Sequence, residues 1–363
     1  MLRGGDIKAG RISTDVPLIT HEKDAEYART RLEADDVVVA LVGYPGESAI
    51  VPPRLASANI SRAVGLLRLS GGLRPDYLVH FLNSSMGRSE FLRPGAGSAQ
   101  MVVNLKDLNK LEVPCPPTVK EQEAIAEALS DADALIEGLE RLIAKKRLIK
   151  QGAMQDLLTA KRRLPGFSGE WAESTIQDAA IVDPEALGAS TSKDRAIRYI
   201  SLEDVNRGAL TGWTETTFGN APSRARRVLR EGDVLLGTVR PNLQSHYLFK
   251  QSGDDWIGST GFAVLRVRPD VCSSRYLFEL IMSNFIGRQI EELIAGSNYP
   301  AISNREGRKL QILVPPLDEQ AAISSLLRDM DTEIQALATR LDKARQVKEG
   351  MMQNLLTGRI RLV

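Results

Sequence analysis

Two long stretches of the chain carry apolar residues at alternating four- and three-residue steps and contain no proline. In the first stretch, 121–158, these residues are Ile125, Leu129, Ala132, Ile136, Leu139, Ile143, Ala153 and Leu157. In the second they are Ile323, Leu327, Met330, Ile334, Leu337, Leu341, Ala344, Met351 and Leu355. Such spacing predicts a coiled-coil seam, interrupted at Lys146, Lys150 and Lys348. A helix of about 38 residues spans roughly 57 Å.

The two stretches are copies of one sequence. Residues 117–164 align without a gap on 315–362 at an offset of 198, and 21 of the 48 positions are identical. The sequence therefore predicts two copies of one unit, a globular domain followed by a long helix. The predicted segments are domain 1–117, helix 118–160, domain 161–314 and helix 315–363.

Upstream of the helices the two copies match more weakly. The matching pairs are Asp6 with Asp204, Gly10 with Gly208, and 32–40 with 229–237. Residues 165–199 have no counterpart before Met1. We therefore expect the first domain to lack an opening strand and turn, because either the true start lies upstream or this copy is shortened.

The charges along each predicted helix are polarised. Residues 121–140 carry seven acidic residues and no basic one, whereas 141–163 carry eight basic residues and one acidic residue. The second helix repeats this polarity in weaker form. Antiparallel packing brings the acidic half of each helix against the basic half of the other, so the charges favour an antiparallel coiled coil.

Composition narrows the class of protein. With 363 residues, 43% of them hydrophobic and 26% charged, the chain is expected to form two or three globular domains. Residues 1–10 are not a signal peptide and no apolar run approaches a membrane span, so we expect a cytoplasmic protein. Cys115 and Cys272 are predicted to be buried thiols. The net charge of +1 means that any surface for nucleic acid must be local.

Several short motifs indicate which class of protein this chain resembles. Each helix begins with Pro-x₃-Glu-Gln-x₂-Ile and ends with Lys-x-Gly-x-Met-Gln-x-Leu-Leu-Thr, at 150–159 and 348–357. Between the copies, the sequence Leu-Pro-Gly-Phe at 164–167 runs into Trp171, and Gly-Asp-Val at 232–234 matches Asp-Asp-Val at 35–37. This pattern resembles the specificity subunit of Type I restriction–modification systems, over essentially the whole chain apart from the missing opening.

The resemblance implies a fold and a function. It implies two mixed α/β target-recognition domains separated by two long helices, which form an antiparallel coiled coil and hold the domains at a set spacing. Each domain would read one half of a bipartite site in double-stranded DNA. The resemblance further implies methyltransferase subunits docked on the helices, and restriction (nuclease and translocase) subunits recruited to the complex.

The candidate DNA contacts lie in polar loops. Arg, Asn and Gln side chains suit base readout, and Lys, Ser and Tyr suit backbone contacts. In the second domain the candidates are Arg224, Arg226, Arg227, Arg240, Asn242, Gln244, His246, Asn298, Tyr299, Ser303, Asn304 and Arg305. In the first domain they are Arg62, Gln100, Asn104 and Lys106. The alternative interpretation is a solvated surface with polar turns.

Apolar side chains beyond the seam predict a surface for partner subunits on the helices. The candidates are Leu135, Leu142, Leu148, Ile149, Met154, Leu158, Met352 and Leu356. The alternative is a spacer with a solvated face.

No catalytic motif is found in the sequence. A Walker A sequence, an adenosylmethionine loop and a nuclease carboxylate motif are all absent. The histidines His21, His80 and His246 are scattered, which argues against metal ligation. We expect a non-catalytic DNA-recognition subunit with no cofactor and no metal. Two alternatives stay open, a coiled-coil adaptor whose first domain no longer reads DNA and a single-chain nuclease.

Overall fold

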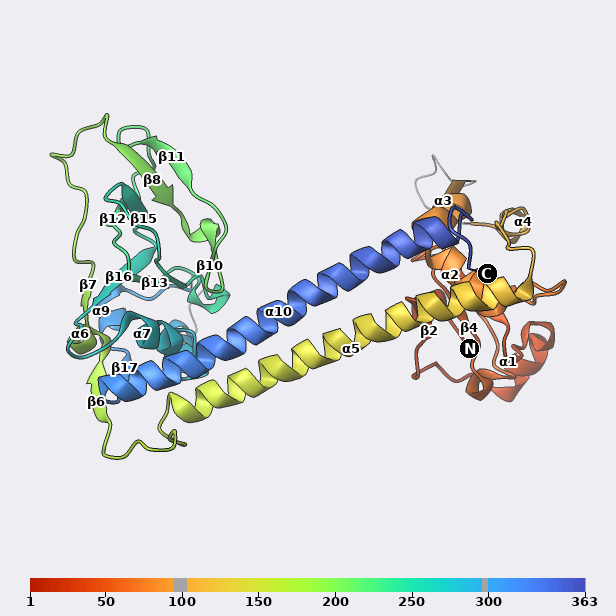
Figure 1. The fold of residues 1–363 in the computed structure, drawn as a ribbon, viewed down its shortest axis with the longest axis horizontal. Coiled ribbons are helices and arrows are strands. Elements are labelled where there is room, and N and C mark those ends of the chain that lie inside the picture. Colours follow the sequence, from red (N-terminus) through yellow and green to blue (C-terminus); the bar gives the residue numbers. More distant parts are fainter. Residues whose placement is uncertain (94–102, 296–299, 363) are drawn as a thin grey trace. The chain divides into compact units, whose positions relative to one another are not determined.

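The computed structural model describes residues 1–93, 103–295 and 300–362. The chain divides into two compact units, one made of Met1–Leu142 with Leu337–Val363 and the other of Ile143–Ala336. We call them unit 1 and unit 2. Each unit holds a globular part and portions of both long helices, α5 (Val119–Leu157) and α10 (Leu317–Leu355) (Figure 1).

The globular part of unit 1 is built on a three-stranded antiparallel sheet of order β4-β3-β5. All four residues of its central strand are buried, because helices and loops cover both faces. The strands are β1 (Ile7–Lys8), β2 (Arg11–Ile12), β3 (Val37–Ala40), β4 (Ser48–Ile50) and β5 (Val64–Leu67). The helices are η1 (Gly4–Asp6), α1 (His21–Glu26), η2 (Ala28–Thr30), η3 (Pro53–Leu55), α2 (Pro75–Asn83), α3 (Ser85–Leu92) and α4 (Leu105–Leu108).

The globular part of unit 2 contains two four-stranded sheets, β14-β13-β16-β7 and β11-β8-β15-β12, and a pair β17-β6. Its strands are β6 (Ala172–Thr175), β7 (Ala180–Val182), β8 (Ala196–Ile200), β9 (Val205–Asn206), β10 (Ala209–Leu210), β11 (Thr214–Thr217), β12 (Ala225–Val228), β13 (Val234–Gly237), β14 (Tyr247–Leu248), β15 (Trp256–Ser259), β16 (Phe262–Val267) and β17 (Gln311–Val314). Its helices are α6 (Ile176–Ala179), η5 (Leu202–Asp204), η6 (Pro241–Leu243), α7 (Ser274–Ile281), α8 (Asn284–Ile294) and α9 (Asn304–Arg308).

The sequence repeat is also a structural repeat. Strand β3 pairs with β5 as β13 pairs with β16, and the hairpin β1–β2 corresponds to β9–β10. The carboxylate of Asp6 accepts a hydrogen bond from Arg3 N (2.8 Å), as Asp204 does from Ser201 N (2.7 Å). This confirms the weak upstream match. The shortening of the first domain stays a prediction, although the described part of unit 1 forms no counterpart of β11 or β12.

The start of each long helix is joined to the N-terminus of an earlier helix in its own unit. The side chain of Gln122 accepts from Arg74 N (2.9 Å), and that of Gln320 accepts from Ser273 N (2.8 Å). Arg74 and Ser273 are the N-cap residues of α2 and α7. The Gln of the Glu-Gln motif therefore fixes one helix start against another.

The neighbouring glutamates bind arginines in the segment that follows the other long helix. In unit 1, the two carboxylate oxygens of Glu121 accept from Nε (2.5 Å) and Nη2 (2.6 Å) of Arg361. In unit 2, those of Glu319 accept from Nε and Nη2 of Arg163, both at 2.6 Å. We call these two pairs the helix clamps. The Arg361 guanidinium holds the pKa of Glu121 below its usual value.

The clamps confirm that the helices pack antiparallel, as the charges predict. A second reciprocal set lies further along, where Lys348 donates to Asp133 (2.5 Å) and Lys150 donates to Asp331 (2.6 Å). Two of the lysines that interrupt the seam are thus paired with aspartates of the opposite helix.

Four predicted partner residues are wrong as an exposed surface, because they form part of the core. Met352 and Leu356 pack with Ile125 and Leu129 in unit 1, and Met154 and Leu158 pack with Ile323 and Leu327 in unit 2. Cys272 is buried as predicted, but Cys115 is exposed. Within the described residues, no helix is long and apolar enough to cross a membrane.

The unit 2 clamp gives a stability prediction. Glu319→Gln leaves Arg163 beside a neutral amide in a site where Glu319 is fully buried, so we expect a loss of about 3–5 kcal/mol in the free energy of unfolding. The matched control is Glu140→Gln, which breaks the exposed Arg345–Glu140 pair and should cost about 0.2–1 kcal/mol. Denaturant titration of both variants measures the two effects. Equal effects would contradict the role of the clamp.

Candidate nucleic-acid interface

Unit 2 contains a cavity of about 1250 Å³ beside the end of β13. Its wall includes three of the predicted DNA contacts, Arg224, Arg240 and Asn242. They come from two loops, one before β12 and one after β13, so the fold brings together residues that are separate in the sequence. The cavity also contains one carboxylate, that of Glu203.

The loop after β13 holds its backbone in an unusual conformation. Arg240 and Gln244 flank the short helix η6 and have φ angles of 48° and 54°, in the left-handed region. Such a φ costs about 1–2 kcal/mol for a residue with a side chain. The backbone N–H of Arg240 donates to Pro300 O (2.7 Å), and the described residues make no ion pair with its exposed side chain. Gln244 is half-buried and is not part of the cavity wall.

His246 is wrong as a predicted DNA contact, because its side chain points into the core. Its exposed fraction is 2%, and its Nδ1 accepts a hydrogen bond from Gly237 N (3.1 Å). Burial lowers the pKa of this imidazole to about 4, so the ring is neutral at pH 7. His246 therefore anchors the 240–246 loop to the end of β13.

Arg227 and Asn304 both bind the buried carboxylate of Asp183, and their role as DNA contacts stays a prediction. Arg227 Nη2 lies 2.9 Å from Asp183 Oδ2, and Asn304 Nδ2 donates to the same oxygen. A buried carboxylate needs such donors. These side chains join β12 and α9 to the end of β7.

The other candidates in unit 2 differ in their surroundings. Arg226 is half-buried, with its guanidinium 4.7 Å from the centre of the Phe218 ring. The Ser303 hydroxyl caps α9, accepting from Glu306 N (3.2 Å) and donating to the Glu306 carboxylate (2.7 Å). Arg305 is exposed, without an ion pair to the described residues. Asn298 and Tyr299 lie outside the described residues.

Unit 1 has a smaller cleft of about 620 Å³ next to the equivalent strand end, beyond β3. Its wall includes three of the predicted DNA contacts, Arg62, Asn104 and Lys106, together with Lys110. All four of these residues are exposed. Gln100 lies outside the described residues. The cleft therefore has three cationic groups and an amide, and no acidic residue lies on its described wall.

Three residues that line the two hollows were not among the predicted DNA contacts. Asn206 and Arg207, in the β9–β10 hairpin, line the unit 2 cavity, and Lys110 lines the unit 1 cleft. The repeat could have marked the hairpin of Asn206 and Arg207 as a shared turn, because Arg207-Gly208 aligns with Ala9-Gly10.

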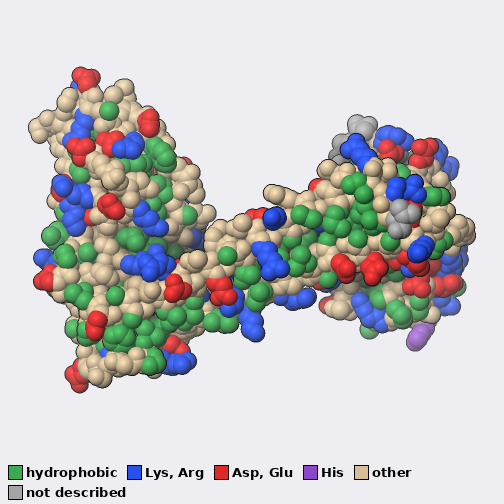
Figure 2. Space-filling view, viewed as in Figure 1, with side chains coloured by type: hydrophobic (Ala, Val, Ile, Leu, Met, Phe, Trp, Pro, Cys, Tyr) green, Lys and Arg blue, Asp and Glu red, His purple; other side chains and the backbone are tan. Residues whose placement is uncertain are grey.

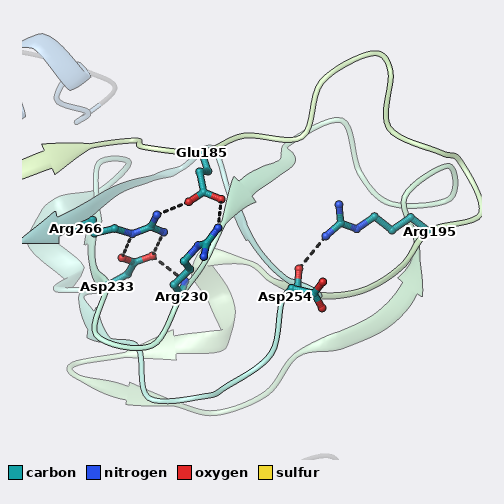
Figure 3. Close-up of polar contacts among 6 residues, drawn as sticks. All are labelled: Glu185, Arg195, Arg230, Asp233, Asp254 and Arg266. Carbon is teal, nitrogen blue, oxygen red and sulfur yellow. Dashed lines mark hydrogen bonds and ion pairs between the residues drawn. The ribbon is translucent and has the colours of Figure 1, made fainter.

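A network of ion pairs fixes β13, the strand that leads to Arg240. Nε and Nη2 of Arg266 donate to the buried carboxylate of Asp233, both at 2.9 Å (Figure 3). Glu185 joins Arg266 to Arg230, and these arginines hold its pKa below the usual value. Asp36 and Arg68 form the same bidentate pair before β3 (2.9 and 2.8 Å). Away from this network, Arg195 binds the Asp254 carbonyl (2.9 Å).

Basic side chains do not gather into one large patch on the face drawn in Figure 2. On the face drawn in Figure 2, Lys and Arg side chains alternate with Asp and Glu, in keeping with the net charge of +1. Among the residues that the structure describes, no group of His, Cys, Asp and Glu is arranged to hold a metal ion. The two basic hollows are suited to an anionic ligand with hydrogen-bonding edges.

A family model described as the Type I restriction modification DNA specificity domain matches residues 5–145 and 188–346. The chain belongs to this family. The Type I restriction enzyme MjaVIII specificity subunit of Methanocaldococcus jannaschii is 23% identical over 303 residues, which cover 79% of this chain and 71% of that protein. The StySPI specificity subunit of Salmonella potsdam is 22% identical, over 98% of this chain and 80% of its own length.

Solved structures of the same kind share the fold of this specificity-family chain. The HsdS subunit from Thermoanaerobacter tengcongensis gives a TM-score of 0.52 at 20% identity, covering 99% of this chain and 90% of that one. A chain from a structural study of a type I R-M system gives a TM-score of 0.58 at 19% identity, covering 91% and 83%. The predicted family and fold class are confirmed.

The buried imidazole gives a pH prediction. Because the pKa of His246 is about 4 in the folded protein and near 6.5 in the unfolded chain, the unfolded chain takes up the proton first as the pH falls. The stability that the neutral ring contributes is present above about pH 6.5, and up to about 3 kcal/mol of it is lost by pH 4.

The matched variant is His246→Asn, whose side-chain oxygen can accept from Gly237 N but does not titrate. Thermal unfolding between pH 7 and 4 should show the wild type losing more stability than the variant, so that the difference between them shrinks. A difference that stays constant with pH would show that His246 does not titrate in this window.

Proposed function

We propose that this chain is the DNA-specificity subunit of a Type I restriction–modification complex. The single observation that supports this most strongly is the pair of basic hollows, one in each copy of a duplicated unit and each next to the same strand end. Family membership supports the same conclusion.

The chemistry of the hollows suits duplex DNA. A guanidinium fork matches the hydrogen-bonding edge of a base or a phosphate, an amide matches adenine, and an ammonium group neutralises phosphate. Arg240 and Asn242 in unit 2, with Arg62 and Asn104 in unit 1, supply the first two groups. Because the net charge is only +1, affinity should come from these sites and from the assembled complex.

The duplication supports a bipartite target. Two units with one framework present two similar faces, as a pseudo-symmetric protein does to two half-sites. The residues on those faces differ, however, so the two half-sites should have different sequences. In unit 2 the cavity is lined by arginines, whereas in unit 1 the cleft carries two lysines and Arg62.

Exposed apolar side chains on the long helix α5 offer a surface for partner subunits. Leu135 and Leu142 of unit 1 and Leu148 and Ile149 of unit 2 stay exposed on α5, with exposed fractions between 38% and 68%. Figure 2 shows hydrophobic side chains on the surface of the long helices. We propose that methyltransferase subunits dock there, that restriction subunits join the complex, and that this chain supplies recognition without catalysis.

The test of this proposal is Arg240→Ala in the full chain, co-purified with the methyltransferase subunit. Mapping the methylated motif should show one base position relaxed in one half-site, with the other half-site unchanged. A bidentate base contact contributes about 1–3 kcal/mol of discrimination. The matched control, Arg288→Ala, removes an exposed arginine of α8 that lies outside the cavity wall and makes no ion pair with the described residues, and should leave the motif unchanged.

Three other outcomes would each contradict one part of the proposed function. An equal loss of methylation at all sites would reassign Arg240 to a phosphate contact. A wild-type complex that methylates no bipartite motif would favour an adaptor. Methyl transfer or cleavage by the isolated chain would contradict the non-catalytic role.

A further inference from the structure

The β9–β10 hairpin carries an arginine where its turn disfavours one. Pairing of Asn206 with Ala209 leaves a two-residue turn, Arg207-Gly208, with φ angles of 44° and 85°. Positive φ at both positions is the type I′ pattern, whose first residue is usually Asn, Asp or Gly. The Arg207 side chain is exposed, and no ion pair or hydrogen bond joins it to the described residues. No contact among the described residues therefore accounts for an arginine at this position, which lines the cavity together with Arg240.

The hairpin is held rigidly beside the loop that carries Arg240. Asp204 accepts at its carboxylate from Ser201 N (2.7 Å) and at its carbonyl from Thr211 N (2.8 Å). The N–H of Gly208 donates to the His246 carbonyl (3.0 Å), which joins the turn to the 240–246 loop. Arg207 and Arg240 therefore line one cavity from two elements that are hydrogen-bonded to each other.

Unit 1 offers an internal comparison for this hairpin. Its β1–β2 turn is Ala9-Gly10, with φ angles of 49° and 79°, and Asp6 holds it through the same two kinds of hydrogen bond. The hairpin thus forms with a methyl group at the position of Arg207. Ala9 N donates to the Glu47 carboxylate (2.6 Å), so this tip lies beside a negative charge. The arginine is not needed to form the turn, and only unit 2 has it.

We propose that Arg207 reads a guanine in the half-site bound by unit 2, and that the unit 1 hairpin contacts no base. The proposal rests on the proposed function. A two-stranded β-ribbon fits the major groove, where the arginine fork can donate to both N7 and O6 of guanine. Arginine with guanine is the commonest specific base contact, and the tethered turn fixes the point from which the Arg207 side chain leaves the backbone. The difference between Arg207 and Ala9 would then be one reason why the two half-sites differ.

The experiment compares wild type, Arg207→Gly and Arg207→Lys as full chains in the complex with the methyltransferase subunit. Glycine suits the positive φ, so Arg207→Gly should fold at least as well as the wild type. Mapping of methylated sites should show that one guanine in one half-site becomes degenerate, with discrimination falling on the order of 10- to 100-fold. Arg207→Lys should also lose it, because an ammonium group lacks the fork.

An unchanged motif in Arg207→Gly would overturn the proposal. So would a uniform loss of methylation that Arg207→Lys restores, since that pattern belongs to a phosphate contact. If the wild-type complex methylates no bipartite motif, the proposed function fails and this inference fails with it. A wild-type motif together with an unaffected Arg207→Gly rejects the inference alone.

Discussion

Two buried carboxylates govern how this chain folds. Glu121 and Glu319 each lie near the first turn of a long helix, and each accepts two hydrogen bonds from an arginine that follows the other long helix. A buried carboxylate without such a partner costs several kcal/mol. The start of one helix therefore requires the end of the other beside it. Since Glu121 and Arg361 are 240 residues apart, this clamp forms only when the segment after α10 has reached the start of α5.

The recognition loops depend on this framework step by step. The glutamines next to the clamp glutamates attach each helix start to α2 or α7, and these helices lie in the same units as the sheets. Asp36–Arg68 and Asp233–Arg266 then fix the strands that lead to the two hollows. The framework is the same in both units, whereas the side chains on the hollows differ. A rigid scaffold with different loops suits a protein that reads two different half-sites.

Much of the framework could be predicted, because a repeat and a helical period are regular patterns. The offset of 198 predicted the two helices, and the polarity of their charges predicted their antiparallel packing.

The exposed loops were harder to predict, since one sequence pattern fits both an outward and an inward side chain. His246, Arg227 and Asn304 looked like DNA contacts, and each binds a buried group, namely Gly237 N or the Asp183 carboxylate. Met154 and Leu158 looked like surface and fill the core. Arg207 was missed because turn strain depends on backbone angles rather than on residue type. The segment boundaries 1–117, 118–160, 161–314 and 315–363 stay predictions.

We propose that two units on one duplicated framework read the two halves of one DNA site. The most direct measurement is genome-wide mapping of methylated bases in cells with and without this gene, alongside co-purification of the chain with the methyltransferase subunit. We expect a stable complex and a bipartite methylated motif that disappears on deletion of the gene. A stable complex whose methylation shows only one half-site, or no dependence on the gene, would contradict this proposal.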